Sequence, residues 1–171
     1  MNTQVMKTSN ARVLALAARF GRIAYVYIRN GVPVDWALSC KGAKSWRNAT
    51  SKTGEWIAKF DPDVVIIEDP ETVRRKKAST KALLRAMVRV AERSPAMVVK
   101  TKRVQHFQNK FDEADAWVAA FPDLAPKLPR RRRLWDPEPR SLVFFEALAL
   151  AEENGFVATK FHRMLKDREE T

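Results

Sequence analysis

The chain has 171 residues, of which 46% are hydrophobic, and 32 Lys and Arg against 20 Asp and Glu give a formal net charge of +12. This length suits a single domain with a real core, and the composition excludes wholesale disorder. No apolar run reaches the ~20 residues that cross a bilayer, and the lone Cys40 can form no internal disulfide. We therefore expect a cytoplasmic protein without membrane contact, whose positive charge favours a nucleic-acid partner.

The first 40 residues predict three strands in succession. Residues 12–17 form an apolar run of strand length, and residues 21–30 are rich in Ile, Val and Tyr. Asn30-Gly31 is a strong hairpin signal, so residues 32–39 should return as a third strand. Together these segments predict an antiparallel meander.

The remaining segments alternate between helical spacing and short apolar runs. The expected elements are a helix at 45–60, a buried strand at 63–69, a helix at 73–93, a strand at 95–100, one or two short helices within 101–121, an exposed Pro-rich loop at 122–139 and a helix at 140–153. This order predicts an α/β fold. Its mixed five-stranded sheet would combine the meander with two parallel strands and carry helices on both faces. We expect one domain over 1–171, with mobile ends at 1–10 and 156–171.

Two carboxylates stand where a surface role is harder to accept. Glu68 ends the buried run VVII, at the strand end where open α/β sheets place their sites; Asp69 points to the opposite face and is the second choice. The alternative is a strand-end acid that simply meets solvent. Glu146 lies on an apolar helix face, where a buried carboxylate is costly unless it is paired or binds a metal. The alternative is that Glu146 lies at the edge of this face and reaches water. By contrast, Asp112, Glu113 and Asp115 suit the acidic first turn of a helix.

The basic residues are clustered. Three groups of basic residues predict phosphate contacts: the run RRKK, the run RRRR, and a third group around residues 100–103. Any one run alone would more simply be a solvated surface. The predicted nucleic-acid-binding residues are Arg74, Arg75, Lys76, Lys77, Lys100, Lys102, Arg103, Arg130, Arg131, Arg132 and Arg133, with Arg19 as a further candidate near the first strand.

The segments VLALAARFGR, VVIIED and DPEPRSLVFFEALALA, in this element order, resemble the RNase H-like superfamily, and within it the RuvC-type Holliday-junction resolvases and their small bacterial and phage relatives. The resemblance implies an endonuclease of DNA recombination and repair. It would act as a homodimer on branched DNA with Mg²⁺ or Mn²⁺. In this family the first strand ends on a metal-binding Asp, the fourth on a Glu, and the last helix carries one or two acids. By resemblance these positions fall on Ala17, Glu68 and Glu146, with Glu68 and Glu146 as metal ligands.

The chain departs from that pattern in two places. Ala17 offers no ligand oxygen, and one turn before Glu146 the helix has Leu142 and Val143. Asp136 and Glu138 are the candidates to supply a substitute. Either the first-strand Asp was replaced deliberately, in which case its restoration would bring back two metal ions, or the natural protein lost it.

Three functions remain open at this point. The leading hypothesis is a Mg²⁺-dependent, structure-selective DNA endonuclease of the Holliday-junction resolvase type that is catalytically inactive as written. The alternatives are a non-catalytic nucleic-acid-binding protein with a degenerate RNase H-like fold, and an RNA-processing nuclease of the related YqgF type. The nuclease hypothesis requires Ala17, Glu68 and Glu146 to lie on one side of the sheet.

Overall fold

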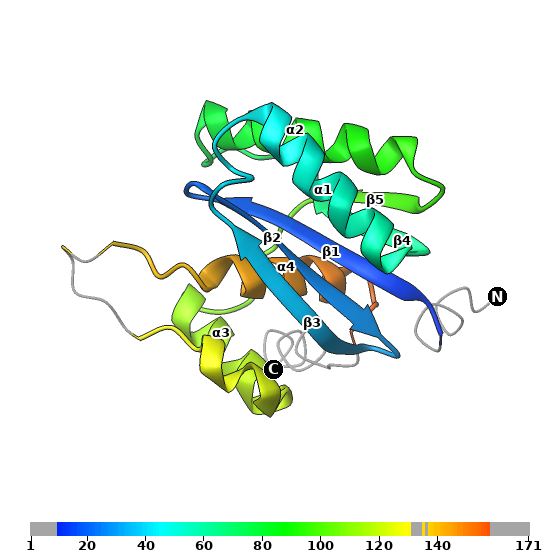
Figure 1. Ribbon diagram of the computed structural model, residues 1–171. Coiled ribbons are helices and arrows are strands. Elements are labelled where there is room, and N and C mark those ends of the chain that lie inside the picture. The colour runs from blue at the N-terminus through cyan, green and yellow to red at the C-terminus, as the bar shows by residue number, and fades with distance from the viewer. Residues whose placement is uncertain (1–9, 131–134, 136, 158–171) are drawn as a thin grey trace.

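A computed structural model describes residues 10–130, 135 and 137–157 of the chain. Its centre is a five-stranded sheet in the order β3-β2-β1-β4-β5, with helices on both faces (Figure 1). The strands are β1 (Arg12–Arg19), β2 (Arg22–Arg29), β3 (Val32–Ser39), β4 (Val64–Glu68) and β5 (Met97–Thr101). The helices are α1 (Trp46–Phe60), α2 (Ala78–Arg93), α3 (Lys110–Ala120), the 3-10 helix η1 (Pro122–Lys127) and α4 (Leu142–Glu153). The predicted α/β fold is confirmed.

The sheet is mixed because β1 pairs antiparallel with β2 and parallel with β4. β3 continues the antiparallel meander and β5 the parallel half. Helices α1 and α2 cover one face and α4 covers the other (Figure 1). Helix α4 is buried on nearly all sides, which explains why its sequence is apolar throughout.

The alternation of side chains along β1 and β4 decides which residues face α4. Val13, Ala15 and Ala17 pack in the core cluster that contains α4, whereas the residues between them face α1 and α2. On β4 the same alternation sends Val64 and Ile66 toward α4, and Glu68 follows them by one further step of two residues. Ala17 and Glu68 therefore point to the same side of the sheet.

Helix α2 begins later than the sequence predicts. The expected helix at 73–93 is wrong over its first turn, because α2 starts at Ala78. The preceding residues form a turn in which an Asp69 carboxylate oxygen accepts a hydrogen bond from the Glu71 backbone N–H at 3.0 Å. Such a local bond competes with helix formation. The RRKK run consequently lies on a loop, and this loop can direct Lys76 inward.

Two differences concern the C-terminal half. The expected loop at 122–139 contains η1, which buries Leu124. The core also extends two residues into the predicted C-terminal tail, because Phe156 and Val157 are buried. The rest of both predicted mobile ends, residues 1–9 and 158–171, lies outside the described residues, and the single domain over 1–171 stays a prediction. Within the described part of the chain, no helix has the length and apolarity to cross a membrane.

Candidate nucleic-acid interface

A strongly basic cavity of about 820 Å³ opens at one end of the sheet. The C-terminal ends of β1 and β4 meet the starts of α2 and α4 at this end (Figure 1). Eight cationic side chains line the cavity against three carboxylates. The cations are Arg19, Arg74, Arg75, Lys76, Lys77, Lys102, Arg103 and Lys110, and the carboxylates are Glu68, Glu138 and Glu146.

The Lys76 ammonium group lies between the two glutamates that the sequence singled out. Its Nζ is 3.1 Å from Glu68 Oε1 and donates a hydrogen bond to Glu146 Oε1. It also donates to the backbone carbonyl oxygen of Ala18, at 2.8 Å. The ammonium thus has three oxygen partners, which matches its three N–H donors. A cation supplied by the chain itself occupies the space between the predicted ligands, next to the end of β1.

Arg19 extends this arrangement along the cavity floor. Its Nη1 donates to Glu146 Oε2 at 3.0 Å, while Nε and Nη2 form a two-pronged pair with the Glu138 carboxylate at 3.0 and 2.7 Å. Lys110 Nζ donates to the same carboxylate at 2.8 Å. Cations and carboxylates alternate in a row, which we call the charge-paired row: Glu68, Lys76, Glu146, Arg19, Glu138 and Lys110.

The two central glutamates share the Lys76 ammonium, but their pKa values shift in opposite directions. Burial alone would raise the pKa of Glu146, but Lys76, Arg103 and Arg19 together outweigh burial and lower it. Burial raises the pKa of Glu68; the positive charge of Lys76 opposes this rise and the negative charge of Glu146 adds to it, so that the net shift is upward. Of these two glutamates, Glu146 is therefore the one held more firmly in its charged form.

The residues present do not fit a divalent metal ion. Position 17, where the resemblance implies a metal-binding Asp at the end of the first strand, holds a fully buried Ala whose side chain is a methyl group. Glu68 and Glu146 do converge, but Lys76 and Arg19 already neutralise them. In the described part of the chain, no group of three or more His, Cys, Asp or Glu side chains is arranged to hold a metal ion.

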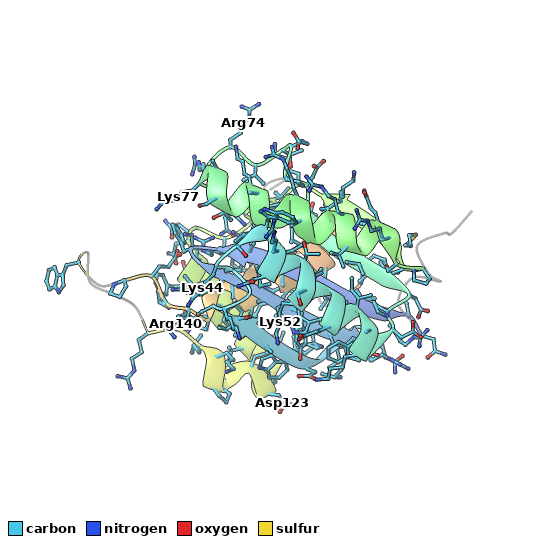
Figure 2. The ribbon with its side chains drawn as sticks, turned by 45° about the horizontal axis from the view of Figure 1, so that its top comes forward. Lys44, Lys52, Arg74, Lys77, Asp123 and Arg140 are labelled. Atoms are coloured by element: carbon cyan, nitrogen blue, oxygen red, sulfur yellow. The ribbon has the colours of Figure 1, made fainter. Side chains whose placement is uncertain are left out.

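The structure brings together some predicted residues and separates others. Asp69 is engaged in the turn before α2 and does not line the cavity. Lys100 pairs with Glu92 at 3.4 Å, and Arg130 is exposed; neither lines the cavity. The predicted phosphate contacts Arg131, Arg132 and Arg133, and the candidate ligand Asp136, lie outside the described residues. Figure 2 shows Arg74 and Lys77 projecting outward beside the start of α2.

The sequence analysis did not anticipate the burial of Glu113, and it did not select Lys110, which lines the cavity. Glu113 lies in the first turn of α3, as predicted, but it is only 3% exposed and accepts a hydrogen bond from Arg103 Nη2 at 2.7 Å. Burial raises the pKa of Glu113 despite this partner. A signal was available, since Glu113 precedes the buried Trp117 by four residues and so shares its helix face. Lys110 was not among the predicted nucleic-acid-binding residues, and its pairing with Glu138 joins residues that are 28 positions apart in the chain.

Comparison with protein-family models and with curated protein sequences finds no match. Comparison with solved structures defines the fold as the RNase H-like fold of Holliday-junction resolvases. The structure of Thermus thermophilus RuvC aligns with a TM-score of 0.56 at 12% identity, over 89% of this chain and 95% of that one. The fowlpox virus resolvase, solved with Holliday-junction DNA, aligns with a TM-score of 0.53 at 12% identity, over 84% of this chain and 96% of that one.

The yeast mitochondrial resolvase Ydc2 gives a TM-score of 0.50 at 10% identity, over 99% of this chain and 89% of that one. At these identities the likeness concerns the fold. The resemblance inferred from the short segments of sequence is thereby confirmed at the level of architecture.

Proposed function

We propose that this protein is a non-catalytic nucleic-acid-binding protein that holds the phosphate backbone of branched DNA in its basic cavity without a divalent ion. The observation that carries this proposal is the Lys76 ammonium between Glu68 and Glu146, inside a cavity where cations outnumber carboxylates. The resolvase-like fold supports branched DNA as the ligand, because two of the similar structures are complexes with Holliday-junction DNA.

The charge pairing favours binding over hydrolysis. A metal-dependent phosphodiesterase needs carboxylates that are free to hold the ions that activate water and stabilise the leaving oxygen. Here each cavity carboxylate has a basic partner from the chain. Binding a metal would require the displacement of Lys76, which would leave its ammonium without its two buried carboxylate partners.

Four lining cations are left for phosphate. Among the described residues, no ion pair involves Arg74, Arg75, Lys77 or Lys102, and all four side chains line the cavity. If each contacts one phosphate, the logarithm of the binding constant should fall with the logarithm of salt concentration with a slope of roughly −3.6. This slope is the quantitative signature of the proposed interface.

The test is fluorescence anisotropy of a labelled four-way DNA junction. The protein is titrated into the junction at several salt concentrations, in buffer that contains either EDTA or Mg²⁺. We expect tight binding in EDTA and no strand cleavage in Mg²⁺. The variant Arg75→Gln should reduce the salt slope by about 1, whereas Lys52→Gln on α1, an equal charge change outside the cavity lining, should leave it unchanged (Figure 2). An equal loss in both variants would mean that only net charge matters, and the cavity would not be the interface.

A junction nuclease with one lost ligand is the second candidate. Its support is that Ala17, Glu68 and Glu146 face the same side of the sheet. This candidate predicts that Ala17→Asp restores cleavage of branched DNA in Mg²⁺, whereas our proposal predicts an inactive variant because Lys76 still neutralises both glutamates. Competition between the four-way junction and structured RNA separates a DNA-binding protein from a YqgF-like RNA-processing protein. Sedimentation analysis tests the predicted homodimer.

A further inference from the structure

Phe20 occupies a turn position that disfavours its side chain. The β1–β2 hairpin turns at Phe20-Gly21, with φ of 40° and 72°. The β2–β3 hairpin uses the same pair of left-handed conformations at Asn30-Gly31, with φ of 52° and 76°. Asn-Gly is the preferred pair for such two-residue turns, whereas a bulky residue at positive φ is strained. The chain thus uses the favoured residue in one hairpin and an aromatic one in the other.

Burial does not explain the aromatic residue either. Phe20 is 52% exposed and belongs to neither core cluster. Neither turn geometry nor core packing accounts for a phenylalanine here. A half-exposed aromatic ring at a strained turn, where Asn would fit better, is the kind of local conflict that marks functional positions.

The position of Phe20 gives the ring a defined environment. Phe20 lines the basic cavity, and the Arg19 guanidinium lies 5.1 Å from its ring centroid. Arg19 is itself fixed by Glu138 and Glu146. The ring therefore lies beside a cation that two carboxylates fix in place, on a half-exposed residue that lines the basic cavity.

We propose that Phe20 stacks on an unpaired or unstacked base of the bound DNA. This inference rests on the proposed function and specifies the ligand as DNA in which a duplex meets exposed bases, as at a junction centre, a gap or a flap. Phosphates of the flanking duplex contact the cavity cations, while Phe20 at the tip of the narrow hairpin contacts a base face. Base–aromatic stacking tolerates any base sequence, so the preference is for structure and not for sequence.

The experiment compares wild type with Phe20→Asn, Phe20→Leu and Phe20→Trp. Asparagine matches the residue of the second hairpin and keeps the turn, leucine keeps apolar bulk without a ring, and tryptophan keeps a stacking surface. Affinities are measured by anisotropy for a four-way junction and for a duplex of equal length. A 2-aminopurine base beside the branch point reports stacking directly by its fluorescence.

We expect the Asn and Leu variants to bind the junction about 5- to 150-fold more weakly, the range that loss of one stacked base implies, with duplex affinity unchanged. The Trp variant should retain junction affinity and the change in 2-aminopurine fluorescence that wild type produces. Wild-type junction affinity in Phe20→Asn, or equal losses on junction and duplex, would overturn the stacking role while leaving the proposed function intact. Failure of wild type itself to bind either DNA would instead remove the proposed function.

Discussion

Replacement of Lys76 by methionine removes the ammonium between Glu68 and Glu146 in the charge-paired row while keeping most of the side-chain length. Glu146 would retain Arg19, but Glu68 would lose the one basic side chain that ion-pairs with it among the described residues. Removing one member of a buried ion pair typically costs about 3–5 kcal/mol of unfolding free energy.

Protonation of Glu68 limits this cost, because the unpaired carboxylate can take up a proton instead of remaining charged. From an ordinary glutamate pKa of about 4.3, protonation at pH 7 costs about 3.7 kcal/mol. We therefore expect a loss of about 3–4 kcal/mol at pH 7. For a chain of this size, that corresponds to a fall in Tm of roughly 6–16 °C.

The pH dependence makes this prediction specific. Burial already raises the pKa of Glu68, and loss of Lys76 would raise it further. A carboxyl group with a raised folded-state pKa contributes its stability at low pH and loses it as pH rises through that pKa. The deficit of Lys76→Met relative to wild type should therefore be small near pH 5 and grow toward pH 7.

The assay is urea unfolding followed by circular dichroism at pH 5 and pH 7. Lys77→Met is the matched control, since it is the adjacent, exposed lysine and should stay within about 0.5 kcal/mol of wild type. The double variant Lys76→Met/Glu68→Gln should recover part of the loss at pH 7. A Lys76→Met protein as stable as the Lys77→Met control at pH 7 would refute the buried pairing on which our account depends.

Three further predictions concern other parts of the molecule. Phe20→Asn should raise the unfolding free energy by roughly 0.5–1 kcal/mol, because relief of the left-handed strain exceeds the lost contact with Arg19; a lower Tm than wild type would contradict this. Asp63 has a lowered pKa because of its hydrogen bonds from Arg12, so its contribution is lost as pH falls through that pKa. Asp63→Asn should therefore reduce the fall of Tm at acid pH, measured by thermal melting at a series of pH values. An unchanged fall would show that the Arg12–Asp63 pair does not cause the loss of stability in acid. Arg103→Gln should lower stability by about 3 kcal/mol, because it leaves the buried Glu113 unpaired, and chemical unfolding of the folded variant measures the loss.

The sheet was predictable because its signals are local. The hairpin at Asn30-Gly31 and the alternation along β1 and β4 both follow from neighbouring residues, so the side of the sheet that Ala17 and Glu68 face was predictable as well. Helix α2 was predicted too long because apolar periodicity does not register the Asp69 turn that delays its start. The later start changes the interpretation of RRKK, since its residues belong to a loop.

The charge-paired row was not predictable from local patterns. It joins Lys76 to Glu146 and Arg19 to Glu138, pairs that are 70 and 119 residues apart in the chain. The sequence analysis selected Glu68 because it ends a buried strand, and Glu146 because it lies on an apolar helix face. It proposed a metal ion as the partner of both, from the chemistry of carboxylate ligands and from the family resemblance. The partner of both is a lysine that the same reasoning had assigned to phosphate binding.

The central claim is that the Lys76 ammonium lies between Glu68 and Glu146, in the place where the sequence analysis expected a metal ion. A crystal structure of the protein grown with Mn²⁺, with anomalous diffraction recorded at the manganese edge, tests it most directly. We predict no manganese peak between the carboxylates of Glu68 and Glu146, and Lys76 Nζ in contact with both. A manganese ion bound by both glutamates, with Lys76 turned out of the cavity, would contradict the account.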